Sequence, residues 1–439
     1  MRSPENMPLK RRKIIRFADC FAGCGGLSLG LMQAGLIGRF AIEHDAFAFE
    51  TLSTNLVGAD TRYKFQWPKW LRKEPVSIGT FLKKNKHQLE ALKGSIDLLV
   101  GGPPCQGFSS AGRRQHDDPR NQLFASYLRL VDALQPRAVL IENVRGFTLD
   151  FDTEGKSKNY AQKLRNRLSE EYDVYEELIN VSEFGVPQAR TRYFLIAIKP
   201  GFCEENPFTL LRRRLPSFLR TKGIKAPVGA WSAISDLEVA RGGVQASKDT
   251  AGFEEICHAG ARTQFQKLMA SGATCTSDLR LARHSAEIVE RFSHIIKESH
   301  LEGRLNTSIS NALRTRYGLK KQALRVLDPD LPAPTITSMP DDLLHYREPR
   351  TLTVRENARL QSFPDWFSFK GKYTTGGDRR RREVPRFTQV ANAVPPLVAE
   401  ALGELLKDIL TKKPKTKVRK ISRCSLHRSQ KVPEVRAQA

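Results

Sequence analysis

The chain has 439 residues, 40% of them apolar, enough to fill the core of one large domain and a smaller one. No run of 18 or more apolar residues occurs, and none follows the basic N-terminus, so we expect neither a membrane helix nor a secretory signal. Seven widely spaced cysteines fit neither a disulfide framework nor a zinc site, so we expect reduced thiols, no metal and a cytoplasmic protein.

The formal net charge of +25 favours a polyanionic partner, and nucleic acid is the commonest one. Residues 1–16 carry six basic and one acidic residue, and residues 411–439 carry ten basic and one acidic residue. We interpret both ends as flexible tails that seek phosphate, although solvated basic tails without a role fit equally well. The chain between them is still basic.

From residue 14 to residue 200, short apolar runs that suit strands alternate with helical patterns. In chain order the strand-like runs are IIRFADC, FAIEHD, IDLLVGG, AVLIENV and RYFLIAIKPG. Continuous apolar strands separated by helices predict a parallel sheet covered on both faces. The expected fold class is therefore α/β.

The pattern changes in residues 201–349, where Pro, Gly and Arg cluster and periodicity weakens, so we expect a second, smaller domain there. The segment HSAEIVERFSHIIKE predicts an amphipathic helix. Its apolar face carries Ile288, Val289, Phe292, Ile295 and Ile296. Helical patterns return in TVRENARLQSF and in NAVPPLVAEALGELLKDIL, whose prolines suit the start of a terminal helix.

The first strand leads into a glycine turn, FADCFAGCGGLSLG, which contains Gly23, Gly25 and Gly26. Such a turn lets a ligand approach backbone N–H groups at a helix N-terminus. Ser28 stands where a dinucleotide fingerprint needs a third Gly or Ala. Glu43, at the end of the next strand, is placed to bind ribose hydroxyls, which favours a nucleoside-containing cofactor without fixing which one. A tight turn followed by a surface acid is the alternative.

The third strand-like run leads into GGPPCQGFS. Its prolines fix the backbone and Gly107 allows a sharp exit, so we expect Cys105 to be presented at the carboxyl edge of the sheet as a candidate nucleophile. The following GFSSAGRRQHDDPRN has no apolar stripe and suits a mobile lid over a polyanion, or a plain solvated loop.

Polar side chains also end the next two strand-like runs. AVLIENV places Glu142 where its carboxyl would face the same crevice as Cys105, as acid–base work on a base ring requires. In FGVPQARTRYFLIAI, Arg190 and Arg192 share one face of an extended segment and could orient a carbonyl oxygen or a phosphate. A solvated arginine pair is the alternative.

Taken in order, DCFAGCGGLS, GGPPCQGFS, ENV, QARTR, RTLTVRENARLQSFPDWF and QVANAVPP resemble the motifs of DNA (cytosine-5) methyltransferases of bacterial restriction-modification systems. The resemblance spans residues 16–199 and 350–403. It implies a Rossmann-like S-adenosylmethionine-dependent methyltransferase sheet with a smaller target-recognition domain. The implied units are a basic tail (1–13), a catalytic and cofactor-binding domain (14–200), a target-recognition domain (201–349), a return to the catalytic domain (350–410) and a basic tail (411–439).

The resemblance implies S-adenosylmethionine as cofactor, with QVANAVPP folded back beside the glycine turn. The implied cofactor residues are Phe21, Gly23, Gly25, Gly26, Leu27, Glu43, His44, Ile78 and Asn392. Two positions depart from the family pattern. PVSIGTFL has no acid for the adenine amino group, so Ile78 would supply only apolar packing, and Ala391 replaces a glycine, so its methyl group should crowd the pocket slightly.

Methylation of cytosine explains these residues chemically. Carbon 5 is too weak a nucleophile to take a methyl group directly, so the thiolate of Cys105 would first add to carbon 6. Glu142 would hydrogen-bond and protonate ring nitrogen 3, while Arg192 and Arg190 would hold the carbonyl oxygen and the thiolate environment. The base must be flipped out of the duplex for this reaction.

The implied partner is double-stranded DNA, with a companion restriction endonuclease acting separately, and we expect a nucleoid-associated monomer. The span 304–325 has six basic residues, no acid, and interleaved Asn, Thr and Ser, which suits contacts to phosphates and base edges, although a solvated loop is the alternative. The residues expected to contact DNA are Ser109, Arg113, Arg314, Arg316, Lys320 and Lys321.

Three other functions compete with this interpretation. An RNA methyltransferase of the same fold would use identical chemistry, but the length of 201–349 and the PPCQGFS motif favour the DNA branch. A DNA-binding regulator that has lost catalysis would not need the full set of motif residues. A nicotinamide oxidoreductase would leave Cys105 and Glu142 unexplained.

Overall fold

The computed structural model describes residues 14–103, 121–148, 160–320, 322–376, 379 and 383–414. Within these ranges no helix combines the length and the apolar character needed to cross a membrane. Cys105, Ser109, Arg113 and Lys321 lie outside the described residues.

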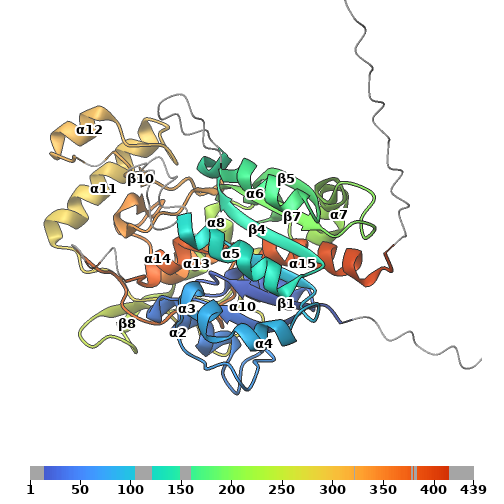
Figure 1. Ribbon diagram of the computed structural model, residues 1–439. Helices are drawn as coiled ribbons and strands as arrows, with labels where there is room; N and C mark the ends of the chain where they lie inside the picture. The colour runs from blue at the N-terminus through green and yellow to red at the C-terminus, as the bar shows by residue number, and fades with distance from the viewer. Residues whose placement is uncertain are drawn as a thin grey trace, which may run out of the picture.

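The centre of the fold is a six-stranded sheet with the order β2-β1-β3-β4-β7-β5 (Figure 1). Its strands are β1 (Arg16–Cys20), β2 (Ile37–Ile42), β3 (Leu98–Gly101), β4 (Ala138–Val144), β5 (Asp173–Asn180) and β7 (Thr191–Ile198). Strands β1 to β4 are parallel to one another, but β7 is antiparallel to both β4 and β5. The expectation of an all-parallel sheet is therefore wrong at β7. The chain joins β5 to β7 through a short turn without a crossover helix, and so short a link returns the strand in the opposite direction.

Helices cover both faces of the sheet (Figure 1), because successive residues of a buried strand point to opposite sides. Leu98 and Val100 of β3 join one apolar cluster, while Leu99 joins the other. The first cluster is completed by α1 (Gly26–Gln33), α2 (Ala46–Leu56), α7 (Pro207–Lys222) and α15 (Pro396–Thr411). The second is completed by α3 (Ile78–Lys84), α4 (Lys86–Ala91), α5 (Asn121–Leu134) and α6 (Tyr160–Ser169). The α/β fold class is confirmed.

The chain after α7 forms shorter elements. They are α8 (Ala230–Ile234), α9 (Val239–Gly242), β8 (Val244–Ala246), β9 (Glu254–Ile256), α10 (Gln264–Ala270), α11 (Ala286–Leu301), α12 (Asn311–Arg316), β10 (Arg325–Val326), β11 (Ala333–Pro334), β12 (Leu343–Leu344), α13 (Val354–Leu360) and α14 (Arg386–Asn392). Short β6 (Gln188–Ala189) and the 3₁₀ turns η1 (Arg145–Thr148), η2 (Val181–Phe184), η3 (Ser235–Leu237) and η4 (Pro340–Asp342) complete the described structure.

The segment after residue 200 packs in two ways. Apolar residues of α7, α8 and α10 join the first cluster of the sheet, whereas α11, α12, β10 and β12 build a cluster of their own. In α11 the side chains of Phe292, Ile295 and Ile296 are buried, as the amphipathic pattern predicts. Val289 is wrong as a core residue, because it lies in the first turn of the helix and is 36% exposed. Separate cores thus form around α11 and α12 and, on a smaller scale, in a cluster of Leu237, Ile256 and Leu279.

Candidate active site

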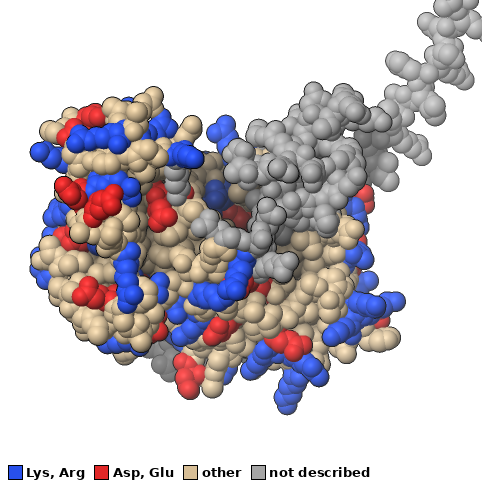
Figure 2. Space-filling view, turned by 90° about the vertical axis from the view of Figure 1, so that its left-hand side faces the viewer, with Lys and Arg blue, Asp and Glu red and all other residues tan. Residues whose placement is uncertain are grey.

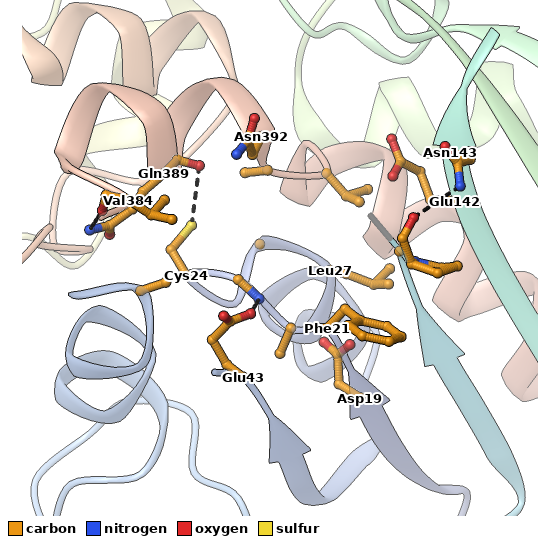
Figure 3. Close-up of a pocket in the computed structure, with 18 of the residues that line it drawn as sticks. Asp19, Phe21, Cys24, Leu27, Glu43, Glu142, Asn143, Val384, Gln389 and Asn392 are labelled. Carbon is orange, nitrogen blue, oxygen red and sulfur yellow. Dashed lines mark hydrogen bonds between the residues drawn. The ribbon is translucent and has the colours of Figure 1, made fainter. Parts of the chain in front are cut away.

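A pocket of about 270 Å³ opens beyond the carboxyl ends of the parallel strands (Figure 3). Its walls come from the glycine turn, the ends of β2, β3 and β4, the start of β7, and α14 with its flanks. The predicted site residues that line it are Phe21, Gly23, Gly26, Leu27, Glu43, His44, Glu142, Arg190, Arg192 and Asn392. The pocket runs without interruption from the glycine turn to the Glu142 carboxyl, so both predicted halves share one space.

The glycine turn is shaped for close approach. Gly23 and Gly25 have φ values of 55° and 97°, a region that side chains rarely adopt. A Cβ on Gly26 would stand 2.5 Å from the carbonyl oxygen of Val394, so the segment after α14 packs directly on the turn. Cys24 strengthens this contact by donating its thiol to the carbonyl of Gln389 across 3.7 Å (Figure 3). A Cβ on Gly25 would instead face Leu56, and Gly25 is not among the lining residues.

Glu43 locks the turn to the end of β2. One carboxylate oxygen accepts a hydrogen bond from the backbone N–H of Gly23 at 2.8 Å (Figure 3), and the other accepts the N–H groups of His44 and Asp45 at the same distance. Each carboxylate oxygen can accept about two hydrogen bonds, so the oxygen that accepts only the Gly23 N–H among the described residues keeps capacity for a ligand. The His44 ring is 71% exposed, and its hydrogen bond to Glu43 raises its pKa.

Asp19 is a pocket residue that sequence reasoning missed. It sits inside β1 and is 1% exposed. Its Oδ2 accepts the hydroxyl of Ser28 at 2.6 Å, but Oδ1 is buried with no hydrogen-bond partner among the described residues. Burial raises the pKa of Asp19 to about 7, nearby Glu43 adds to this, and the Ser28 bond opposes it. The available signal was an acid within an otherwise apolar strand, directly before the glycine turn.

Glu142 and Arg192 meet across neighbouring strands. Glu142 lies near the end of β4, and its Oε1 is 3.2 Å from Nε of Arg192 at the start of β7. Burial raises the pKa of the Glu142 carboxyl, and the charges of Arg192 and then Arg190 oppose that rise. A buried carboxyl with a raised pKa can keep its proton near neutral pH and act as an acid.

Arg190 joins the arginine segment to α14. Its side chain is 2% exposed, and its Nη1 donates to the carbonyl of Ala391 at 2.7 Å. Ala391 thus contributes a backbone acceptor, while its neighbours Asn392 and Ala393 line the pocket. The expected crowding of the pocket by the Ala391 methyl group is wrong, because that residue is buried beside the pocket and does not line it.

The backbone that leads to Cys105 is tied to the pocket. Gly102 and Pro103 both line it, and the amide of Asn143 donates to the Pro103 carbonyl at 3.1 Å (Figure 3). A Cβ on Gly102 would lie 3.3 Å from Oε2 of Glu142, so this exit passes directly beside the carboxyl. Cys105 follows Pro103 by two residues.

Ile78 is not brought to the pocket. It is the first residue of α3 and 2% exposed, and it belongs to the apolar cluster that contains Phe40 and Phe81. The segment is held near the site only through the N–H of Val76, which donates to the Glu43 carbonyl at 2.7 Å. Ile78 therefore packs in the core and does not line the pocket, and its place among the cofactor residues stays a prediction.

The predicted DNA-reading arginines lie apart from the pocket, on the lobe that carries α11 and α12 (Figure 1). On α12 Arg316 is exposed and Arg314 is half-buried, and Lys320 is exposed just after the helix. Arg316 Nη1 is 3.4 Å from Nε2 of His294 on α11. Figure 2 shows Lys and Arg side chains on this lobe and, across a hollow in the same face, on the part of the molecule below it.

Comparison with known proteins adds to this geometry. The family model for the C-5 cytosine-specific DNA methylase matches residues 15–408. The type II methyltransferase M.DdeI of Desulfomicrobium norvegicum is 32% identical over 405 residues, which cover 88% of this chain and 87% of the relative. M.XorII of Xanthomonas oryzae pv. oryzae, also a type II methyltransferase, is 29% identical over 421 residues, covering 90% and 85% of the two chains.

The fold has a solved counterpart. A crystal structure of an E. coli prophage protein described as a DNA modification methyltransferase aligns with a TM-score of 0.59 and 25% identity. The alignment covers 91% of this chain and 100% of the other.

Proposed function

Because the chain belongs to the family of C-5 cytosine-specific DNA methylases, we propose that its pocket joins a site for the methyl donor to a site for a flipped cytosine. The protein is an S-adenosylmethionine-dependent DNA cytosine methyltransferase. The observation that carries the proposal is the single pocket shared by the glycine turn and the Glu142–Arg192 pair. Transfer of tritium from labelled S-adenosylmethionine to duplex DNA tests it.

The residues of the deeper half fit this donor. S-adenosylmethionine carries an ammonium and a sulfonium charge, and Asp19 and Glu43 supply carboxylates on the pocket wall. The unpartnered Oδ1 of Asp19 is suited to the ammonium group, and the remaining capacity of Glu43 to ribose hydroxyls. Phe21 and Leu27 offer apolar surface for the adenine. The bound donor supplies an electrophilic methyl group.

Asp19 should make donor affinity depend on pH. Its pKa of about 7 means that the carboxylate is neutral below that value and charged above it. Affinity for S-adenosylmethionine, measured by isothermal titration calorimetry, should therefore increase as the pH rises through about 7. Asp19→Asn should weaken binding above neutral pH by about tenfold or more and flatten the profile.

Two controls accompany the Asp19 prediction. Ser28→Ala removes the hydrogen bond that lowers the Asp19 pKa. In this variant the increase in affinity for S-adenosylmethionine should therefore occur at a higher pH than in the wild type. Since the folded pKa lies above the unfolded value, ionisation of Asp19 costs stability as the pH rises from about 4 to about 7. Asp19→Asn should thus melt higher than the wild type at pH 8 while binding the donor less tightly. An unchanged affinity profile would remove Asp19 from the donor site.

The chain's own residues divide the work on the base. Glu142, whose pKa is raised by burial, would in its protonated form donate to ring nitrogen 3 of cytosine and stabilise the charge that develops when the ring is attacked. Arg192 would orient Glu142 through Nε and place the positive charge of its guanidinium near the base carbonyl. Arg190 would hold this segment against α14. Cys105 would supply the thiolate that adds to carbon 6 and leaves after methyl transfer and loss of the carbon 5 proton.

Sequence recognition would fall to the α11–α12 lobe. We expect Arg314 or Arg316 to contact a guanine, so replacing the correct one with alanine should cost about 1–3 kcal/mol of discrimination at a single base pair. Lys320→Ala should instead weaken binding to all sequences and lower the salt dependence. Methylation rates on single-base variants of the target site separate these effects. If neither arginine substitution changes the preference at any position, recognition lies elsewhere in residues 201–349.

The relatives point to a biological setting. M.DdeI and M.XorII are named as type II methyltransferases. We propose that this chain likewise protects the DNA of its host as a monomer, with a companion restriction endonuclease that acts as a separate protein. The proposed units keep residues 14–200 and 350–410 for catalysis, residues 201–349 for recognition, and 1–13 and 411–439 as basic tails.

A further inference from the structure

One wall of the pocket is held in place by residues from the middle of the chain. The wall is α14 with its flanks, whose residues Gln389 and Asn392 line the pocket. The helix begins at Arg386, and Nη1 of this arginine lies 2.6 Å from Oδ2 of Asp249 and 3.0 Å from Oδ1 of Asp278. Asp249 lies between β8 and β9, 137 residues before its partner. A hairpin of the 201–349 segment therefore reaches the start of the pocket wall.

Stacked rings and guanidinium groups reinforce this contact. The hydroxyl of Tyr373 donates to Oδ2 of Asp249 at 2.7 Å, and its ring lies 4.2 Å from Cζ of Arg386. Cζ of Arg280 lies 3.6 Å from the same ring and 4.3 Å from the ring of Phe253 beside β9. A cation is attracted to the face of an aromatic ring. The hairpin and α14 are therefore joined by these cation–ring contacts as well as by the ion pair.

The position of Arg386 is transmitted to the pocket through Gln389, one turn further along α14. The side-chain oxygen of Gln389 accepts the hydroxyl of Thr51 at 2.6 Å, and its backbone carbonyl accepts the Cys24 thiol of the glycine turn. Asn392 follows one turn later and lines the pocket. A displacement of Arg386 would therefore move both the lining residues of α14 and their contacts with the glycine turn.

The two aspartates differ in what else they support. Asp278 is 4% exposed and also binds the guanidinium of Arg355 and the N–H of Phe369, so it belongs to the core. The side chain of Asp249 is 36% exposed, and apart from Arg386 and the Tyr373 hydroxyl its partners are the hydroxyls of Ser247 and Thr250 in its own hairpin. Asp249 can therefore be substituted without disrupting core packing, whereas a substitution of Asp278 would also break its contacts with Arg355 and Phe369.

We propose that Asp249 is a positioning residue for the methyl-donor site: by fixing Arg386 it holds α14 in the position that binds S-adenosylmethionine. The inference rests on the proposed donor site in this pocket. It makes donor affinity depend on a hairpin of the segment that we assign to target recognition.

The test is Asp249→Asn in the full-length chain, a change that keeps the shape of the side chain and removes its charge. The dissociation constant for S-adenosylmethionine, measured by calorimetry at a temperature where all variants are folded, should rise about tenfold. KM for the donor should rise by a similar factor, while kcat at saturating donor and the affinity for DNA stay unchanged. Asp249→Glu should recover part of the loss.

The matched control is Asp408→Asn on α15, which removes the charge of another exposed aspartate, paired with Arg214 at 2.7 Å and away from the pocket lining. It should bind the donor like the wild type. The proposal is overturned if Asp249→Asn keeps the wild-type affinity, including the case in which only its melting temperature falls, or if both variants lose affinity equally. Failure of the wild type itself to bind the donor would overturn the proposed function of the pocket instead.

Discussion

Cys105→Ala is expected to abolish methyl transfer, because without a thiolate no bond to carbon 6 forms and carbon 5 stays too weak a nucleophile. The last described residue before Cys105 is Pro103, whose carbonyl accepts a hydrogen bond from the amide of Asn143. Gly102, just before it, lies beside the Glu142 carboxyl. Tritium transfer from labelled S-adenosylmethionine to duplex DNA measures the loss.

The same variant should keep its binding functions. Sequence-specific DNA binding, measured by gel shift against an unrelated duplex, should survive, because the proposed recognition residues lie on the separate α11–α12 lobe. Transfer within about tenfold of the wild-type rate would show that Cys105 is not the nucleophile. Loss of both transfer and DNA binding would point to a structural role.

Glu142→Gln is expected to slow the chemical step by about 100-fold or more, the scale of lost general-acid help. Glutamine keeps the shape of the side chain but cannot transfer a proton to ring nitrogen 3. Single-turnover rates at saturating donor and DNA measure this step directly. The wild-type rate should fall as the pH rises through the raised pKa of Glu142, since the required proton is then lost. The variant should lack this decline.

The outcome also separates two roles for Glu142. A slower single-turnover rate with unchanged donor affinity assigns it to the base. An unchanged rate with weaker donor binding would move it to the donor site. Glu176→Gln is a useful control, because Glu176 lies on the edge strand β5, pairs with Arg165 of α6 and does not line the pocket.

Much of the site could be predicted because its residues follow strand ends, and parallel strands bring their carboxyl ends to one edge. This rule is enough to bring Glu43 and Glu142 to the same pocket, and Arg192 enters beside them from β7. Gly26 could be recognised as a turn residue, but its contact with Val394 depends on a helix more than 350 residues later. Motif order was the only sequence signal for that contact.

The errors have physical causes. An apolar run indicates a buried strand but not its direction. The antiparallel direction of β7 could therefore not be predicted from its residues, and it follows from the short link between β5 and β7. Asp19 was hidden because a strand interior predicts core, although its burial against the pocket is what raises its pKa. Val289 is an apolar residue whose pattern does not tell which surface it meets. Likewise, no local pattern pairs Asp249 with Arg386.

The central claim is tested most directly by bisulfite sequencing of plasmid DNA from bacterial cells that lack cytosine methylation of their own and express this chain. Cytosine methylated at carbon 5 resists conversion. The account predicts that one cytosine within every copy of a short sequence resists conversion, and that cells expressing the Cys105→Ala variant show complete conversion at the same positions. Complete conversion throughout the plasmid, in cells that contain the folded wild-type protein, would contradict the account.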